Sequence, residues 1–217
     1  MRRVIITIGL AVLMIGFGKT TQADWVTIQV EGMVDRVEDY GNYLGGKVIV
    51  GSKMTGWYTY DTSVPDTEPW EKVGHYPQNN SPAGIHFEIE GFSFNSNHNA
   101  LDFHLDITND NAAYLGDYQD VYQFRSYGNM PFIEGVPINF IGMELLDYSG
   151  NALSSDALPT MAPNLDLWQW NGLDIISDRK FGIGAHITSA IPEPGSLALL
   201  IIGTLSLYSR KTTKDSK

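Results

Sequence analysis

The chain has 217 residues and contains no cysteine. This absence excludes disulfide bonds, thiolate zinc sites, a cysteine nucleophile and a lipid anchor on an N-terminal cysteine. A chain of this length can bury a core that is large enough to fold without cross-links. We therefore expect its stability to come from apolar burial, to which a bound metal could add.

Basic residues are also few. Between Asp24 and Ala190 the chain carries 7 basic and 23 acidic residues, which is a net charge of −16. A domain with this charge repels phosphate backbones, so we expect no nucleic-acid partner. Divalent cations and neutral or cationic ligands remain compatible with it.

The familiar catalytic motifs are missing as well. The sequence has no Gly-x-Ser-x-Gly, no His-Glu-x-x-His and no glycine-rich phosphate-binding fingerprint, and its five histidines are scattered. These motifs mark serine hydrolases, zinc hydrolases and nucleotide-binding proteins. We therefore predict that the domain is not an enzyme and has no catalytic cofactor.

The apolar residues that are present recur with a period of two. In residues 101–107, for example, Leu, Phe, Leu and Ile alternate with Asp, His and Asp. Between the two ends of the chain, no stretch of ten or more residues keeps a helical apolar stripe. This pattern predicts an all-β fold, an antiparallel β-sandwich of jelly-roll-like type. The expected strands are 26–31, 47–50, 53–60, 86–90, 92–95, 101–107, 120–126, 138–146, 167–170 and 181–188.

Two long segments interrupt this pattern. Residues 61–84 contain four prolines and residues 148–166 contain two. Loops of this length are uncommon unless they have a role or local order.

The N-terminus has the layout of a signal peptide. A basic start, Arg2 and Arg3, precedes the apolar run 4–17, and small residues lead up to Ala23. We expect residues 1–23 to form a signal helix that signal peptidase removes, so that the mature chain begins at Asp24. A membrane anchor or a buried helix is the alternative, but the run is short for a span of about 20 residues.

The C-terminus has a second apolar run. Pro192-Glu193-Pro194 is followed by the apolar stretch 197–208 and by Arg210-Lys211. The basic flank favours an orientation with the preceding domain outside the cytoplasm. On length alone, a buried core helix would be a fair rival to a membrane anchor.

The order and position of these features resemble the PEP-CTERM sorting signal, over about 27 residues. The resemblance implies recognition by an exosortase near the Pro-Glu-Pro motif and a Gram-negative-type envelope, often in bacteria that make extracellular polysaccharide. Together with the signal-peptide layout and the period-two pattern, it divides the chain into a signal peptide (1–23), an exported β-sandwich domain (24–190) and a sorting and anchoring segment (191–217). This last segment is expected to hold the protein in the inner membrane transiently or stably.

A looser resemblance concerns the domain itself. Gly32-Met33-Val34, the stretch 56–62, Pro65-Asp66 and Gly74-His75-Tyr76 are similar to a region near the start of many β-sandwich domains of PEP-CTERM proteins. Those domains mostly have no assigned activity, so this likeness implies a fold and little about function.

Two strands carry titratable residues on their polar faces. The candidates for binding are His86 and Glu88 on one strand and Asp102 and His104 on the other. If the two strands were neighbours, these side chains would lie within about 5 Å of one another across the ladder. Such a cluster could bind a metal or supply the two carboxylates of a glycosidase. A simply solvated sheet face is the interpretation that we prefer.

Calcium is the metal that the sequence favours. Hard oxygen ligands cluster around Asp61, Asp66 and Asp110, and calcium prefers such ligands. Neither segment has the spacing of an EF-hand, and Asp is also an ordinary turn residue. A structural calcium ion is therefore an alternative to no bound cofactor.

Trp168 and Trp170 would share one face of a strand, about 7 Å apart. That spacing suits the stacking of successive sugar rings, although core packing is the interpretation that we prefer. The sequence thus predicts an exported, exosortase-sorted cell-surface or matrix protein without catalytic activity. The alternatives are a carbohydrate-binding module of the extracellular polysaccharide layer and a secreted glycan hydrolase.

Overall fold

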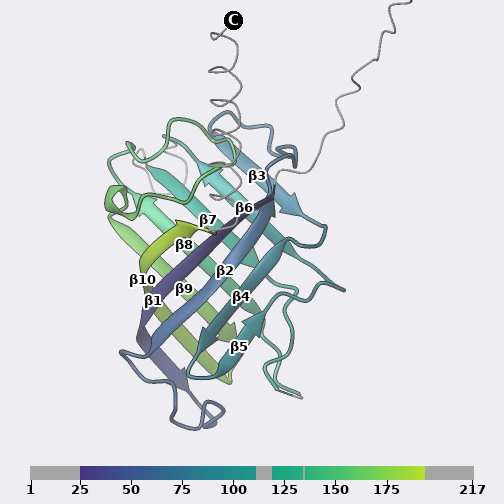
Figure 1. Cartoon of the computed structure of the whole chain (residues 1–217), viewed down its shortest axis with the longest axis vertical. Coiled ribbons are helices and arrows are strands. Elements are labelled where there is room, and N and C mark those ends of the chain that lie inside the picture. Colours follow the sequence, from purple (N-terminus) through teal and green to yellow (C-terminus); the bar gives the residue numbers. More distant parts are fainter. Residues whose placement is uncertain (1–24, 111–118, 134, 194–217) are drawn as a thin grey trace, which may run out of the picture.

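The computed structural model describes residues 25–110, 119–133 and 135–193, which form one antiparallel β-structure (Figure 1). Its strands are β1 (Trp25–Asp39), β2 (Lys53–Asp61), β3 (Val73–Gln78), β4 (Gly84–Ile89), β5 (Phe92–Asn95), β6 (Phe103–Thr108), β7 (Asp120–Ser126), β8 (Phe140–Asp147), β9 (Trp170–Ser177) and β10 (Phe181–Pro192). The described residues hold one short 3-10 helix, Leu165–Leu167, and no α-helix. No helix in this part of the chain is long and apolar enough to cross a membrane. Both predicted terminal helices lie outside the described residues.

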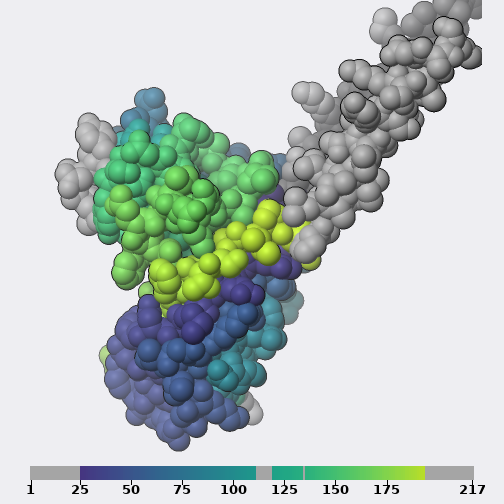
Figure 2. Space-filling model, turned by 60° about the vertical axis from the view of Figure 1, so that its left-hand side comes forward, coloured from purple at the N-terminus to yellow at the C-terminus, as the bar shows by residue number. Residues whose placement is uncertain are grey.

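The ten strands make one continuous sheet in the order β3-β6-β7-β8-β9-β10-β1-β2-β4-β5. Strands β6 to β10 follow one another as neighbours, and β1 pairs with β10 to join them to β2 and β4. In Figure 2, β10 (yellow) runs between the green segments that precede it and the purple first strand. The first and last described strands therefore pair with each other in the middle of the sheet, and β3 and β5 form its two edges.

The two halves of this sheet face each other across a single aromatic core. The Tyr58 hydroxyl on β2 forms a 2.9 Å hydrogen bond with the Tyr122 hydroxyl on β7. The Phe87 ring on β4 lies 6.3 Å from that of Phe124 on β7. All four side chains are fully buried. The period-two prediction of an antiparallel all-β fold is confirmed, and the facing halves are consistent with a β-sandwich.

The long segment after β8 closes one end of the core. Asp147 starts its turn, with Oδ1 accepting from the Ser149 backbone N–H and hydroxyl and Oδ2 accepting from the backbone N–H groups of Asn151 and Ala152. Further along, the buried Asp120 carboxylate accepts from the Leu153 N–H at 2.7 Å. The loop is therefore locally ordered, because the carboxylates of Asp147 and Asp120 accept hydrogen bonds from its backbone.

Replacing Asp147 by Asn should lower the free energy of unfolding by about 2 kcal/mol at pH 7, because an ionised acceptor of several hydrogen bonds is lost. Burial alone would raise the pKa of Asp147, but hydrogen bonds from Ser149, Asn151 and Ala152 outweigh it and lower the pKa. The stabilisation is therefore present above the unfolded-state pKa of about 3.9 and disappears as the pH falls through the lower folded-state pKa.

Urea unfolding at pH 7 and below pH 3 measures this effect. The difference between the wild type and Asp147→Asn should shrink in acid. Asp178→Asn, which alters an exposed carboxylate, is the matched control and should stay within about 0.5 kcal/mol of wild type. An equal loss in both variants would contradict the role given to Asp147.

Most predicted strands are confirmed, and 92–95 and 120–126 match β5 and β7 residue for residue. The predicted strand 47–50 is wrong, because this stretch forms turns. The predicted strand 167–170 is also wrong: it is the end of the 3-10 helix and the approach to β9. Strand β10 continues beyond Ala190 to Pro192, so the folded unit is slightly longer than expected.

Candidate functional site

The sheet register aligns polar residues and glycines on the face that turns away from the core. One row runs across five strands and consists of Arg125 (β7), Gly142 (β8), Asp174 (β9), Gly184 (β10) and Arg36 (β1). A β-bulge between Val34 and Arg36 shifts the register of β1. Because a bulge reverses the alternation of side chains, it places Arg36 on this outer face.

A second row lies beside the first on the same face. It consists of His75 (β3), Asp106 (β6), Gln123 (β7), Glu144 (β8) and Gly172 (β9). The outer face of this half of the sheet therefore carries cationic, anionic and amide groups over a floor that contains three glycines.

The first row and the Gln123, Glu144 and Gly172 part of the second row line a groove with a volume of about 440 Å³. The glycines deepen it, because no side chain rises from the floor at their positions. A Cβ atom on Gly172 would lie 3.3 Å from the indole nitrogen of Trp170, and one on Gly142 would overlap the Phe140 ring. Two aromatic rings thus lie over glycine backbone, and the Trp170 side chain is 54 % exposed.

Charges of both signs line the groove. The Arg36 guanidinium donates to Asp174 Oδ1 at 2.6 Å, and Arg125 donates to Gln123 Oε1 at 2.7 Å. Burial raises the pKa of Glu144, nearby Arg125 lowers it and Asp174 raises it, with a net upward shift. The groove can therefore donate and accept hydrogen bonds beside a flat apolar surface.

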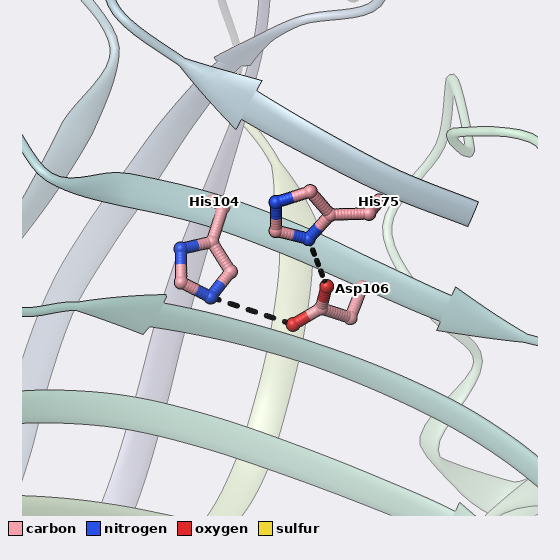
Figure 3. Close-up of side chains that lie close together, drawn as sticks. All are labelled: His75, His104 and Asp106. Atoms are coloured by element: carbon pink, nitrogen blue, oxygen red, sulfur yellow. Dashed lines mark hydrogen bonds and ion pairs between the residues drawn. The ribbon is translucent and has the colours of Figure 1, made fainter. Parts of the chain in front are cut away.

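Next to the groove lies a cluster of His75, His104 and Asp106, defined here as the histidine–aspartate cluster (Figure 3). His75 Nδ1 lies 2.6 Å from Asp106 Oδ1, and His104 Nε2 lies 3.5 Å from Oδ2 of the same carboxylate. The centroids of the two imidazole rings are 4.9 Å apart. In the described part of the chain, this is the only group of three such residues with the geometry of a metal site.

Comparisons with protein-family models, curated proteins and solved structures found no match to this chain. What this surface binds is therefore inferred from its own chemistry.

The predicted tryptophan pair is separated by the structure. Trp168 ends the 3-10 helix, is only 7 % exposed and packs edge-on against Tyr122 in the core. Trp170 begins β9 and faces solvent at the groove. The preferred interpretation of core packing is thus correct for Trp168 and wrong for Trp170, and the stacking pair does not exist.

The four titratable candidates do not come together either. Strand β4, with His86 and Glu88, pairs with β2 and β5, whereas β6, with His104, pairs with β3 and β7. Asp102 precedes β6. The two strands are therefore not neighbours, and the cluster that required them to be does not form. His86 instead stacks on Trp57 and, with Glu88, borders a separate shallow hollow of about 300 Å³.

The residues that were predicted to bind calcium, Asp61, Asp66 and Asp110, lie at the end of a strand or in loops. Asp61 Oδ1 accepts from the Ser63 N–H and hydroxyl, while Asp66 Oδ1 accepts from the N–H groups of Glu68 and His75. Asp110 adopts a left-handed backbone conformation with φ of 50°. The structure does not gather these three carboxylates into one ligand group within the ranges it describes.

The sorting motif begins inside the sheet. Pro192 pairs with Ile28 at the end of β10, and the Glu193 N–H donates to Thr27 O at 3.0 Å. The other predicted processing residues, namely Ala23, Asp24, Pro194, Arg210 and Lys211, lie outside the described residues.

The site residues predicted from the sequence did not include Arg36, His75, Gln123, Arg125, Glu144 or Asp174. The sequence of β3 carries no apolar alternation that would mark His75, because its buried positions are Gly74, Tyr76 and Gln78. No sequence signal singles out Glu144 or Asp174 either, since the cross-strand register alone makes them neighbours.

Proposed function

We propose that this domain is a non-catalytic glycan-binding module of an exported surface protein. The observation that carries the proposal is the groove in which Trp170 offers an exposed indole above Gly172. Sugar rings have apolar faces that pack on aromatic rings and hydroxyl groups that exchange hydrogen bonds with charged and amide side chains. Arg36, Gln123 and Asp174 provide such groups around the groove.

Size and charge also favour a glycan. The groove volume of about 440 Å³ lies within the range of about 300–1,000 Å³ that is typical of small-ligand sites. Its lining holds two arginines together with the carboxylates of Asp35, Glu144 and Asp174, so it suits a neutral or weakly charged polymer. The strongly acidic domain would repel the phosphate backbone of a nucleic acid.

The remaining expectations are part of the same proposal. Signal peptidase would release the chain after Ala23, and an exosortase would process it near Pro192-Glu193-Pro194. An extracellular polysaccharide would be its binding partner at the cell envelope. The facing sheet halves support a sandwich architecture. A jelly-roll-like arrangement and two flanking helices are further parts of the proposal. Strands β6 to β10 are connected as a meander, in which each strand pairs with the next one along the chain.

The test is a panel of immobilised glycans that includes extracellular polysaccharides. The purified full-length protein should bind a subset of them, and a soluble form of the same glycan should compete. Binding to every acidic and neutral polymer alike, or to none, would contradict a glycan-binding function and leave a structural surface protein.

A second candidate, glycan hydrolysis, is favoured by one observation. Glu144 and Asp174 are diagonal neighbours across the β8–β9 ladder, so their Cβ atoms lie about 7–8 Å apart or less. Glycosidases place two carboxyl groups about 5–9.5 Å apart and raise the pKa of the acid, and the pKa of Glu144 is raised.

Release of reducing ends from a bound glycan tests this second candidate. Hydrolysis predicts product with the wild type and none with Glu144→Gln, while binding is retained. Binding without product in the wild type would eliminate hydrolysis and leave the binding function intact.

A further inference from the structure

We propose that His75, His104 and Asp106 bind a divalent transition-metal ion of the zinc type. The three residues come from adjacent strands β3 and β6, where His75 is the direct cross-strand partner of Asp106. All three side chains are partly exposed, so an ion has access to them from solvent.

The ligand set suits this class of metal. Two imidazoles and one carboxylate are a common ligand set of catalytic zinc and non-haem iron sites, and they leave coordination positions open. Hard cations such as calcium prefer oxygen-only ligands. The cluster therefore differs in chemistry from the oxygen-rich sites that the sequence suggested.

The geometry needs only a small adjustment. One ligand atom from each residue lies within 4.8 Å of the other two. Tetrahedral zinc with bonds of about 2.1 Å needs ligand atoms about 3.4 Å apart. Small side-chain rotations would close this difference, because strand pairing fixes the backbone of His75 opposite that of Asp106 and both side chains are partly exposed.

Charges of both signs surround the cluster. The positive charge of Arg125 opposes a cation at this position, while Asp102 and Asp106 and the acidic domain favour one.

The competing arrangement is a metal-free network in which both imidazoles share the Asp106 carboxylate. Such a network satisfies the polar groups by itself and would not depend on the identity of the ion. A metal site, in contrast, discriminates zinc from calcium and magnesium and depends on both histidines.

Calorimetric titration of the metal-stripped full-length protein with Zn²⁺ separates the two arrangements. We expect one equivalent of zinc to bind, with calcium and magnesium unable to displace it. His75→Gln and His104→Gln should each weaken zinc binding at least tenfold. His86→Gln and His186→Gln, which alter histidines outside the cluster, are the matched controls and should bind as the wild type does.

A second measurement uses the unmutated chain and so does not depend on the folding of variants. Imidazole nitrogen chemical shifts should change on zinc addition for His75 and His104, and not for His86, His98 or His186. Absence of zinc binding, or equal shifts at all five histidines, would overturn the proposal. So would unchanged zinc affinity in His104→Gln. None of these readouts involves a glycan, so the metal site can fail while the proposed binding function stands.

Discussion

Replacement of Trp170 by alanine is expected to weaken glycan binding by about 30-fold. The indole is 54 % exposed beside the groove and lies over Gly172. Burying a large apolar side chain contributes about 1.5–3 kcal/mol, and about 2 kcal/mol corresponds to roughly 30-fold in affinity. Calorimetry with the glycan that gives the strongest panel signal measures the change.

Trp70→Ala is the matched control for this experiment. Trp70 is even more exposed, at 72 %, but it lies between β2 and β3 and does not line the groove. The control should retain wild-type affinity. An equal loss in both variants would point to non-specific adhesion through exposed tryptophans, and no loss in Trp170→Ala would remove the indole from the site.

Changing Pro192, Glu193 and Pro194 together to alanine should have an all-or-none effect on localisation. If an exosortase reads this motif, the variant should accumulate uncut in the inner membrane, whereas the wild type should lose its tail. Cell fractionation combined with intact mass measurement checks the result. The alanine variant keeps the apolar run and the basic cluster, so membrane insertion itself should not change.

This experiment needs a control that separates loss of the motif from loosening of the end of β10. Because Pro192 pairs with Ile28 and Glu193 donates to Thr27, the triple variant could loosen the end of β10. Ile191→Ala alters the same strand end, at a residue that is 49 % exposed, without touching the motif. It should be processed as the wild type is. Identical mass and fractionation of the triple variant and the wild type would contradict the sorting proposal.

The sequence was sufficient to predict an antiparallel all-β fold, because the alternation of buried and exposed side chains is a local property of a strand. Strand β6 shows this most clearly: Phe103, Leu105 and Ile107 are buried, while His104 and Asp106 are only partly buried. Burial of every second residue follows directly from strand geometry. The prediction of a polar face on this strand is therefore confirmed.

Two strands were missed for physical reasons. Strand β3 contains Pro77, which argued against a strand, but β3 is an edge strand, where a missing N–H donor is tolerated. On β9, Asn171, Gly172 and Asp174 hide the alternation of Leu173 and Ile175. The apolar stretch before β9 was taken for the strand instead.

The candidate site could not be assembled from the sequence, because it depends on which strands pair. His104 and Asp106 were correctly placed on a polar face, yet their partner is His75 on β3 and not His86 on β4. Likewise, Arg36 reaches the groove through a bulge in β1. Register and strand order are set by long-range pairing, which local patterns do not specify.

If the groove on the outer face of β8 and β9 binds glycan, hydroxyl-radical footprinting of the unmutated full-length protein will show it most directly. Trp170 borders the groove, Trp57 borders the separate hollow on β2 and β4, and Trp70 borders neither. With saturating glycan, oxidation of Trp170 should fall severalfold while that of Trp57 and Trp70 stays unchanged. Protection of Trp57 instead, or equal oxidation of Trp170 with and without glycan, would contradict the account.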